Sequence, residues 1–209
     1  MEEFCGMKEF LALQSNMSAP SYFDKIDQWV AAGSTSGENL SEALIQFTVL
    51  NQKRIKRILK TYKVSESLQK LLDQLQGEQH WFVFTEAWCG DSAQLSPIFA
   101  KIAEASKGKI HLSFLLRDEH PTLMDRYLTN GGRSIPKLVA FDESGLELFQ
   151  YGPRPAAAQA LLIDWKQNPR GRSHEYFEQE LHASYAKDRG KSTETELLEL
   201  LQQYTHQAC

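Results

Sequence analysis

Short, continuously apolar runs alternate with helical segments from about residue 80 onward, and this alternation constrains the fold more than any other feature. The runs are Trp81–Phe84, Ile110–Leu116 and Leu138–Phe141. Near-continuous apolar character is typical of strands that are covered on both faces. We therefore expect an α/β fold in which helices flank a central sheet.

A fourth strand is expected directly after the third. The residues Asp142-Glu143-Ser144-Gly145 are a turn signal before Leu146–Phe149, and they predict an antiparallel hairpin within a mixed sheet. The expected order is β-α-β-α-β-β-α. We expect the first of its three helices to begin near Asp91 or Ser92. The second should run from about Pro121 to Leu128, and the third from about Pro155 to Trp165.

Helical segments extend the chain on both sides of this pattern. The first ~75 residues predict no strand but three helices, around Tyr22–Val30, around Leu40–Leu59 and after the N-cap residue Ser65. Two more are expected around Glu175–Ala186 and from Thr193, which forms a capping-box pattern with Glu196. We divide the chain into an N-terminal helical extension (1–65), a central α/β domain (66–167) and a C-terminal helical extension (168–209).

Charge and hydropathy exclude several classes of partner. The formal net charge of -4 gives no overall attraction to nucleic acid or to an anionic membrane. The basic residues between Lys53 and Lys60 alternate with apolar ones, which is typical of a solvated helix face. No apolar run approaches the roughly 20 residues of a membrane helix. We therefore expect neither nucleic acid nor membrane as a partner.

Cysteine usage favours a reducing compartment. The three cysteines, Cys5, Cys89 and Cys209, are too few for a disulfide scaffold, and the acidic start of the chain lacks the positive region of a secretory signal. We expect a cytoplasmic protein whose cysteine chemistry is catalytic or redox-responsive. The histidines show no spacing typical of zinc ligands, so we expect no metal.

The residues Trp88-Cys89-Gly90-Asp91-Ser92 carry the chemistry. They follow the first predicted strand and open a helix, which puts the Cys89 sulfur at the N-terminal end of that helix. Unpaired backbone N–H groups and the helix dipole stabilise a thiolate there. Because only the thiolate attacks disulfides or electrophiles, Cys89 is the candidate nucleophile.

Four features in order resemble the thioredoxin family. They are the active-site turn Trp88–Ser92, Pro97 eight positions after Cys89, the loop Ser134-Ile135-Pro136 before a strand, and Gly152 after the last strand. The resemblance covers about residues 66–167. More narrowly, Thr85–Ser92 together with Gly131–Lys137 are similar to a bacterial thioredoxin-like subfamily with helical extensions at both ends.

This resemblance implies a thioredoxin-like fold and a set of site residues. Cys89 and Ser92 would be catalytic, with Ser92 hydrogen-bonding the sulfur. Substrate would contact Trp88, Gly90, Asp91, Ser134, Ile135 and Pro136. A cis-Pro136 turns the chain toward Cys89, and Ile135 would pair its backbone with an extended substrate.

Two departures limit what the resemblance implies. Ser92 stands where thioredoxin has its resolving cysteine, so the dithiol cycle is closed to this motif. Val83 stands where thioredoxin has a buried aspartate. Asp91 repels a neighbouring thiolate and offsets the helix dipole, so we expect a Cys89 pKa near the ordinary ~8.5 in a turn that is usually exposed.

Three functions follow as hypotheses. The first is a monothiol thiol–disulfide exchange protein that acts through Cys89 on a protein or low-molecular-weight mixed disulfide, with no cofactor and with glutathione or another small thiol as co-substrate. The second is a non-catalytic module that binds extended peptide. The third is a redox-sensing thiol protein. The oligomeric state stays open.

Two further features have alternative interpretations. Cys5 and Cys209 are interpreted as bystanders, with a resolving role as the alternative. The loop Arg117-Asp118-Glu119-His120 is interpreted as a polar connection, and the alternative is that it tunes Cys89 or contacts a partner.

Overall fold

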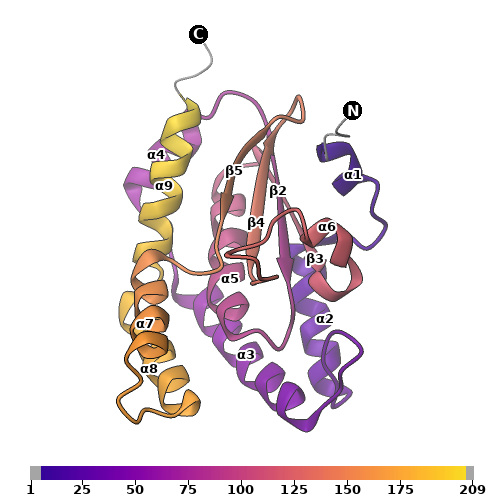
Figure 1. Ribbon diagram of the computed structural model, residues 1–209. Helices are drawn as coiled ribbons and strands as arrows, with labels where there is room; N and C mark the ends of the chain where they lie inside the picture. Colours follow the sequence, from indigo (N-terminus) through magenta and orange to yellow (C-terminus); the bar gives the residue numbers. More distant parts are fainter. Residues whose placement is uncertain (1–5, 206–209) are drawn as a thin grey trace.

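A five-stranded mixed sheet forms the centre of the structure, a computed structural model that describes residues 6–205 (Figure 1). The strand order is β1-β3-β2-β4-β5. β2 is parallel to β3 and antiparallel to β4, which forms the predicted hairpin with β5. The bounds are β1 Met17–Ser18, β2 Gln79–Thr85, β3 Ile110–Leu116, β4 Lys137–Asp142 and β5 Glu147–Tyr151.

The continuous apolar character of β2 arises because both of its faces are covered. Trp81 and Val83 point into one hydrophobic cluster, whereas Phe82 and Phe84 point into the other. Successive side chains of a strand lie on opposite faces, so each cluster receives every second residue. The expected α/β architecture is thereby confirmed.

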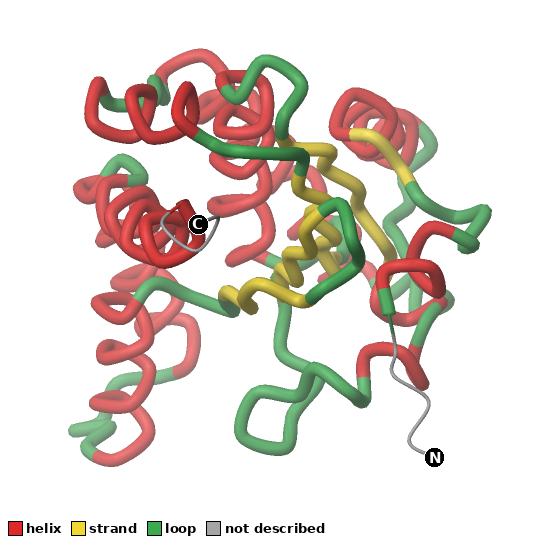
Figure 2. The backbone as a smooth tube through the Cα atoms, turned by 90° about the horizontal axis from the view of Figure 1, so that it is seen from above, coloured by secondary structure: helices red, strands yellow, loops and turns green. Residues whose placement is uncertain are grey.

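Helices cover the two faces unequally. One face is packed by α5 (Gly90–Ala105), by α7 (Ala156–Gln167) and by the helices of both extensions other than α1 (Met7–Leu11). The other is covered by α1 and by α6 (Pro121–Met124), which follows the 3-10 turn Arg117–Glu119. Seen along the view of Figure 2, the strands lie in the middle of these helices.

The second predicted helix of the central pattern is shorter than expected. It ends at Met124 rather than at Leu128, because the following residues make tighter i to i+3 bonds, such as Tyr127 N–H to the Met124 carbonyl. Asn130 and Gly131 then have positive φ angles of 51° and 77°. The chain turns there into the Thr129–Gly132 bridge.

The segment before β2 contains the three predicted helices. They are α2 (Ala19–Ala31), α3 (Glu42–Thr61) and α4 (Glu66–Gln74). Ser65 caps α4 as predicted, because its Oγ accepts from the Leu68 N–H at 3.2 Å. The expectation that this segment holds no strand is wrong: β1 pairs with β3 at Met17 and Ser18. A two-residue strand is too short to leave a periodic pattern.

The C-terminal extension is a helical pair, α8 (His174–Asp188) and α9 (Lys191–Thr205). The predicted capping box is wrong, because α9 begins before Thr193 and buries that residue. Glu196 instead accepts hydrogen bonds from the Tyr151 hydroxyl and the Ala156 N–H, both at 2.8 Å. Long-range partners thus take the carboxylate that the local pattern assigned to a cap.

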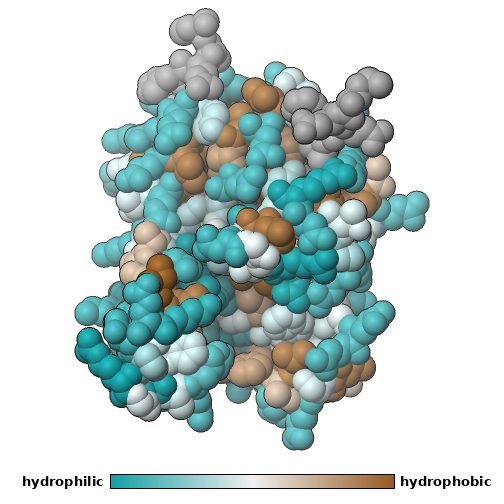
Figure 3. All heavy atoms as spheres, viewed as in Figure 1, coloured by the Kyte–Doolittle hydropathy of each residue, from teal (hydrophilic) through white to brown (hydrophobic). Residues whose placement is uncertain are grey.

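The larger hydrophobic cluster joins all three segments of the chain. It contains Tyr22 of α2, Leu95 of α5 and Leu201 of α9, each no more than 1% exposed. The surface is different in character, since the face in Figure 3 is largely hydrophilic. Within residues 6–205, no helix has the length and apolar character needed to cross a membrane.

Candidate active site at Cys89

Cys89 is the N-cap residue of α5, as the sequence predicts. Its backbone is extended, with φ -76° and ψ 118°, and it follows the turn that leaves β2. The Ser92 N–H donates to Sγ at 3.5 Å, and Sγ donates to the Ile135 carbonyl at 3.4 Å. The sulfur therefore lies between the first turn of α5 and the loop that precedes β4.

That loop contains the Ile135–Pro136 peptide bond in the cis form, the isomer that the resemblance implies. Ile135 and Pro136 are buried and Ser134 is half-buried. Gly152, which directly follows β5, supports the loop: its φ is +106°, and a Cβ built on it would lie 2.2 Å from the Pro136 carbonyl oxygen. Only glycine fits so close to that backbone.

Cys89 is more buried than expected. Its exposed fraction is 9%, and burial raises the pKa of its thiol to about 11, with a further contribution from the negative charge of Asp91. The Ser92 side chain and the backbone N–H groups of Ser92 and Asp91 oppose this increase in pKa. The expectations of an exposed turn and of an ordinary pKa are therefore wrong, because the loop at Ile135 covers the sulfur.

Ser92 is buried beside the sulfur, with 1% of its surface exposed. Its backbone N–H contacts Sγ, whereas its hydroxyl oxygen has no hydrogen-bond partner within residues 6–205. The hydrogen bond from Ser92 to the sulfur comes from the main chain, and the Ser92 side chain also lowers the pKa of the Cys89 thiol. The side chain leaves one unpaired polar atom in the site.

The side chain of Asp91 contacts residues that lie far along the chain. Its carboxylate pairs with Arg154 at 2.5 Å and accepts a hydrogen bond from the Tyr185 hydroxyl at 2.8 Å. Burial raises the pKa of Asp91, and these two partners oppose that rise. Arg154 and Tyr185 lie 63 and 94 residues further along the chain, and no local pattern connects them to Asp91.

Gly90 packs against α8. A Cβ on Gly90 would lie 2.8 Å from two atoms of the His182 ring and 3.4 Å from the Arg54 guanidinium. His182 also pairs with Gln94, at 3.2 Å between Nδ1 and Nε2. Burial and the charges of Arg54, Arg154 and Arg57 lower the pKa of His182 to about 4.

The interpretation of the basic run in α3 as a wholly solvated face needs a correction at Arg54. This side chain is half-buried and donates to Asn51 Oδ1 at 2.8 Å. Asn51 in turn donates to the Ala87 carbonyl at 2.9 Å. The N-terminal extension therefore contacts the active-site turn through these polar residues. Sequence periodicity assigned Arg54 to the surface and did not single out Asn51.

The loop after β3 reaches the active-site turn from the other side. The Arg117 guanidinium lies 5.1 Å from the centre of the Trp88 ring, a cation–π contact. Glu86 is fully buried and holds this loop by accepting hydrogen bonds from the Asp118 N–H and the Ser36 hydroxyl. Glu86 precedes the motif by two residues, and no sequence pattern marks it as part of the site.

The other two cysteines and the expectation of no metal site concern residues outside the active-site turn. Cys5 and Cys209 lie outside the described residues, so their interpretation as bystanders stays a prediction. Among residues 6–205, no group of histidine, cysteine and acidic side chains is arranged to hold a metal ion.

Comparison with known proteins adds family information to this geometry. A sequence profile described as "Thioredoxin" matches residues 37–166. The chain is 36% identical to a thioredoxin of Rickettsia felis over 82 residues. This stretch covers 39% of this chain and 72% of that protein. It is 36% identical over 58 residues to thioredoxin 1 of a Nostoc species, 28% of this chain and 51% of that protein.

Two solved structures share the fold. One is a Pseudomonas aeruginosa protein of unknown function, with a TM-score of 0.57 and 17% identity over 89% of this chain and 98% of that one. The other is an HIV epitope scaffold, with a TM-score of 0.52 and 15% identity over 84% of this chain and 96% of that one. Both comparisons extend beyond the residues 37–166 that the family profile matches, and at these identities they show the fold alone.

Proposed function

Since the chain belongs to the thioredoxin family, we propose that it carries out thiol–disulfide exchange of the monothiol type through Cys89. The observation that carries this proposal is the position of Sγ, which lies at the N-terminus of α5 and 3.4 Å from the Ile135 carbonyl. Ser92 occupies the place of a second cysteine, so exchange stops at a mixed disulfide until an external thiol arrives.

The proposed reaction begins with a protein whose cysteine is joined to glutathione. The Cys89 thiolate attacks the glutathione sulfur, a new disulfide forms at Cys89, and the protein thiolate leaves and takes up a proton. A second glutathione then attacks the adduct and releases glutathione disulfide. The protein sulfur is reduced, the sulfur of the incoming glutathione is oxidised, and Cys89 returns to the thiol.

The loop at cis-Pro136 supplies the proposed substrate groove. Trp88 lies half-buried at one side, and Ser134, Ile135 and Pro136 form the other. We assign Ile135 the role of pairing with extended substrate backbone. Gly90 and Asp91 support the groove indirectly, because their contacts are to His182, Arg154 and Tyr185.

The raised pKa of Cys89 determines how the reaction depends on pH. With a pKa of about 11, only about one molecule in ten thousand carries the thiolate at pH 7. We therefore expect slow attack at neutral pH and faster attack as the pH rises. A thiolate of high pKa is also a poor leaving group, so the adduct at Cys89 is long-lived.

Burial of the Cys89 sulfur favours the binding module as an alternative function and weakens the redox sensor. A groove with a covered, protonated thiol suits a module that binds extended peptide without exchange. A redox sensor needs a low-pKa, accessible thiol, and the 9% exposure of Cys89 and its pKa of about 11 oppose that function.

The test is turnover of a glutathione mixed disulfide with excess glutathione, from pH 7 to pH 9. We expect wild-type turnover to increase with pH and to vanish in Cys89→Ala. Cys5→Ser and Cys209→Ser are the matched controls and should retain activity. If wild-type turnover does not exceed that of Cys89→Ala while both proteins bind an extended peptide equally, the binding-module function replaces this proposal.

A further inference from the structure

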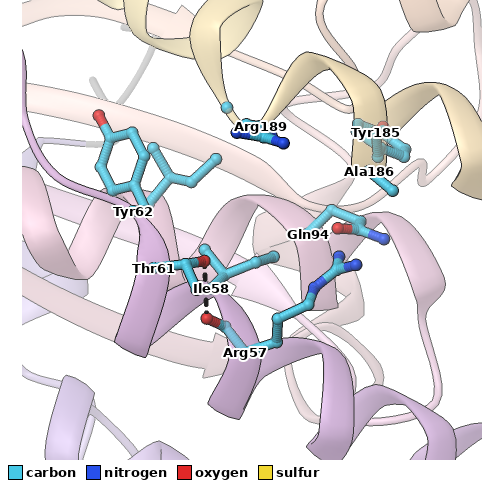
Figure 4. Close-up of a pocket in the computed structure, with 10 residues that line it drawn as sticks. Arg57, Ile58, Thr61, Tyr62, Gln94, Tyr185, Ala186 and Arg189 are labelled. Carbon is cyan, nitrogen blue, oxygen red and sulfur yellow. Dashed lines mark hydrogen bonds between the residues drawn. The ribbon is translucent and has the colours of Figure 1, made fainter.

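A cavity of about 430 Å³ lies where α3, α5 and the end of α8 meet. Its volume is within the range of small-molecule sites. Figure 4 shows Arg57 extending from its helix toward Gln94, with Tyr185, Ala186 and Arg189 on the opposite side. The lining residues are Arg57, Ile58, Thr61, Tyr62, Gln94, Ile98, Tyr185, Ala186, Arg189 and Gly190.

The buried part of the lining is mainly apolar. Ile58, Ile98 and the two tyrosines are at most 9% exposed. The hydroxyl of Tyr62 donates to Glu194, and that of Tyr185 donates to Asp91. Both hydroxyls are thus satisfied by carboxylates that do not line the cavity, and the tyrosines contribute aromatic surface to it.

The charged part of the lining is entirely positive. Arg57 and Arg189 line the cavity, and no aspartate or glutamate does. Neither arginine has an ion-pair partner within residues 6–205, in contrast to Arg154, which pairs with Asp91. Two unpaired guanidinium groups beside aromatic surface favour an anion that carries an apolar body.

We propose that this cavity binds a small organic anion with an aromatic or similarly flat apolar body, whose acidic group contacts Arg57 and Arg189. The site is separate from the groove at cis-Pro136, and its occupancy does not require exchange at Cys89. A carboxylate, a sulfonate or a phosphate ester satisfies the same chemistry, because each accepts hydrogen bonds from a guanidinium fork.

Fluorescence titration of the full chain with 8-anilinonaphthalene-1-sulfonate tests the proposal. Its uncharged relative, N-phenyl-1-naphthylamine, is the matched probe without the acid. We expect one saturable site for the sulfonate and weaker binding of the uncharged compound. Arg57→Gln and Arg189→Gln should each raise the dissociation constant of the sulfonate about tenfold, with little effect on the uncharged probe.

Two further variants separate the cavity from general surface charge. Lys53→Gln removes an exposed positive charge from the same helix, outside the cavity, and should leave binding unchanged. Ala186→Trp places a large side chain at an exposed lining position, so it should abolish binding without disturbing the core. The proposal is overturned if the double arginine variant and Ala186→Trp, both folded by circular dichroism, bind the sulfonate as wild type does.

Discussion

At Cys89, the contact that defines the site also suppresses ionisation of the thiol. The Ile135 carbonyl accepts the S–H hydrogen bond, and this bond exists only while the sulfur is protonated. The opposing contribution comes from the helix N-terminus, where the Ser92 N–H favours the thiolate. Burial outweighs it, and the pKa rises to about 11.

Asp91→Asn should make Cys89 more reactive. The Asp91 charge is the second largest cause of the raised Cys89 pKa, so its removal lowers that pKa and increases the thiolate fraction at any pH below it. We expect iodoacetamide to alkylate Cys89 about three to ten times faster at pH 8.5, measured by mass spectrometry of the Cys89 peptide. Asp24→Asn, an exposed control, should show the wild-type rate; an unchanged rate in Asp91→Asn would contradict the electrostatic cause.

Gly152→Ala should be strongly destabilising. The added Cβ would lie 2.2 Å from the Pro136 carbonyl oxygen, which is backbone and has little room to move. We expect a loss of more than about 3 kcal/mol in the free energy of unfolding, measured with urea. Gly108→Ala is the matched control: its φ is +94° but nothing lies within 4 Å of the new Cβ, so only the backbone cost of about 1 to 2 kcal/mol remains. If Gly152→Ala and Gly108→Ala lose the same unfolding free energy, the close contact with the Pro136 carbonyl is not the cause.

The residues of the site were predictable where the signal is local. Cys89 at the start of a helix, the loop at Pro136 and the glycine after the last strand all follow from short, ordered motifs. The partners of Asp91 and Gly90 were not, since Arg154, His182 and Tyr185 come from segments whose approach is decided by tertiary packing. Burial of the sulfur has the same origin, and for that reason the expected pKa was wrong.

At the scale of elements, α8 covers the start of α5 and brings an uncharged histidine to it. His182 faces Arg54 and Arg57 from α3, and Arg154 from the segment before α7. A positive charge on His182 would be repelled by all three guanidinium groups. The contact between α8 and α5 therefore depends on His182 staying neutral.

Acid should weaken this contact. The folded pKa of His182 is about 4 against an ordinary 6.5, so the unfolded chain binds the proton more readily and stability falls as the pH drops from 6.5 through 4. We expect wild type to lose about 2 to 3 kcal/mol more over this interval than His182→Gln, measured by urea denaturation. His174→Gln, at an exposed site on the same helix, should lose as much stability as wild type. Equal losses of unfolding free energy in His182→Gln and wild type would contradict the assigned role of His182.

Most elements were predictable because their patterns are long. The helices α2, α3, α4, α5, α7 and α8 and the strands β2 to β5 lie where periodicity and apolar runs predicted them. The prediction was wrong for the short elements and for the ends of two helices. β1 and α1 are too short to show a period, α6 ends at Met124 because the next residues make i to i+3 bonds, and Glu196 binds Tyr151 rather than capping α9.

At the scale of the whole molecule, the two extensions complete one core. The residue boundaries at 65 and 168 stay a prediction, but the larger cluster crosses both of them, with Tyr22, Leu95 and Leu201 each no more than 1% exposed. The family profile likewise begins at residue 37, inside the predicted N-terminal extension. A core shared in this way favours cooperative unfolding of the three segments together.

Leu201→Ala should therefore destabilise the entire chain and not only α9. Its side chain is fully buried, and we expect a loss of about 2 to 5 kcal/mol with a single calorimetric transition at a lower Tm. Leu146→Ala, at a position that is 63% exposed, should leave the Tm nearly unchanged. Two separate transitions, with only one shifted by Leu201→Ala, would show that the extension folds independently.

The pairing of β1 with β3 has a consequence for solubility. β3 would be the outermost strand without β1, and its backbone at Ser113 and Phe114 would offer unpaired N–H and C=O groups to the strands of other molecules. Met17 and Ser18 occupy those groups from within the same chain. The shortest strand of the sheet thus protects the protein from edge-to-edge aggregation.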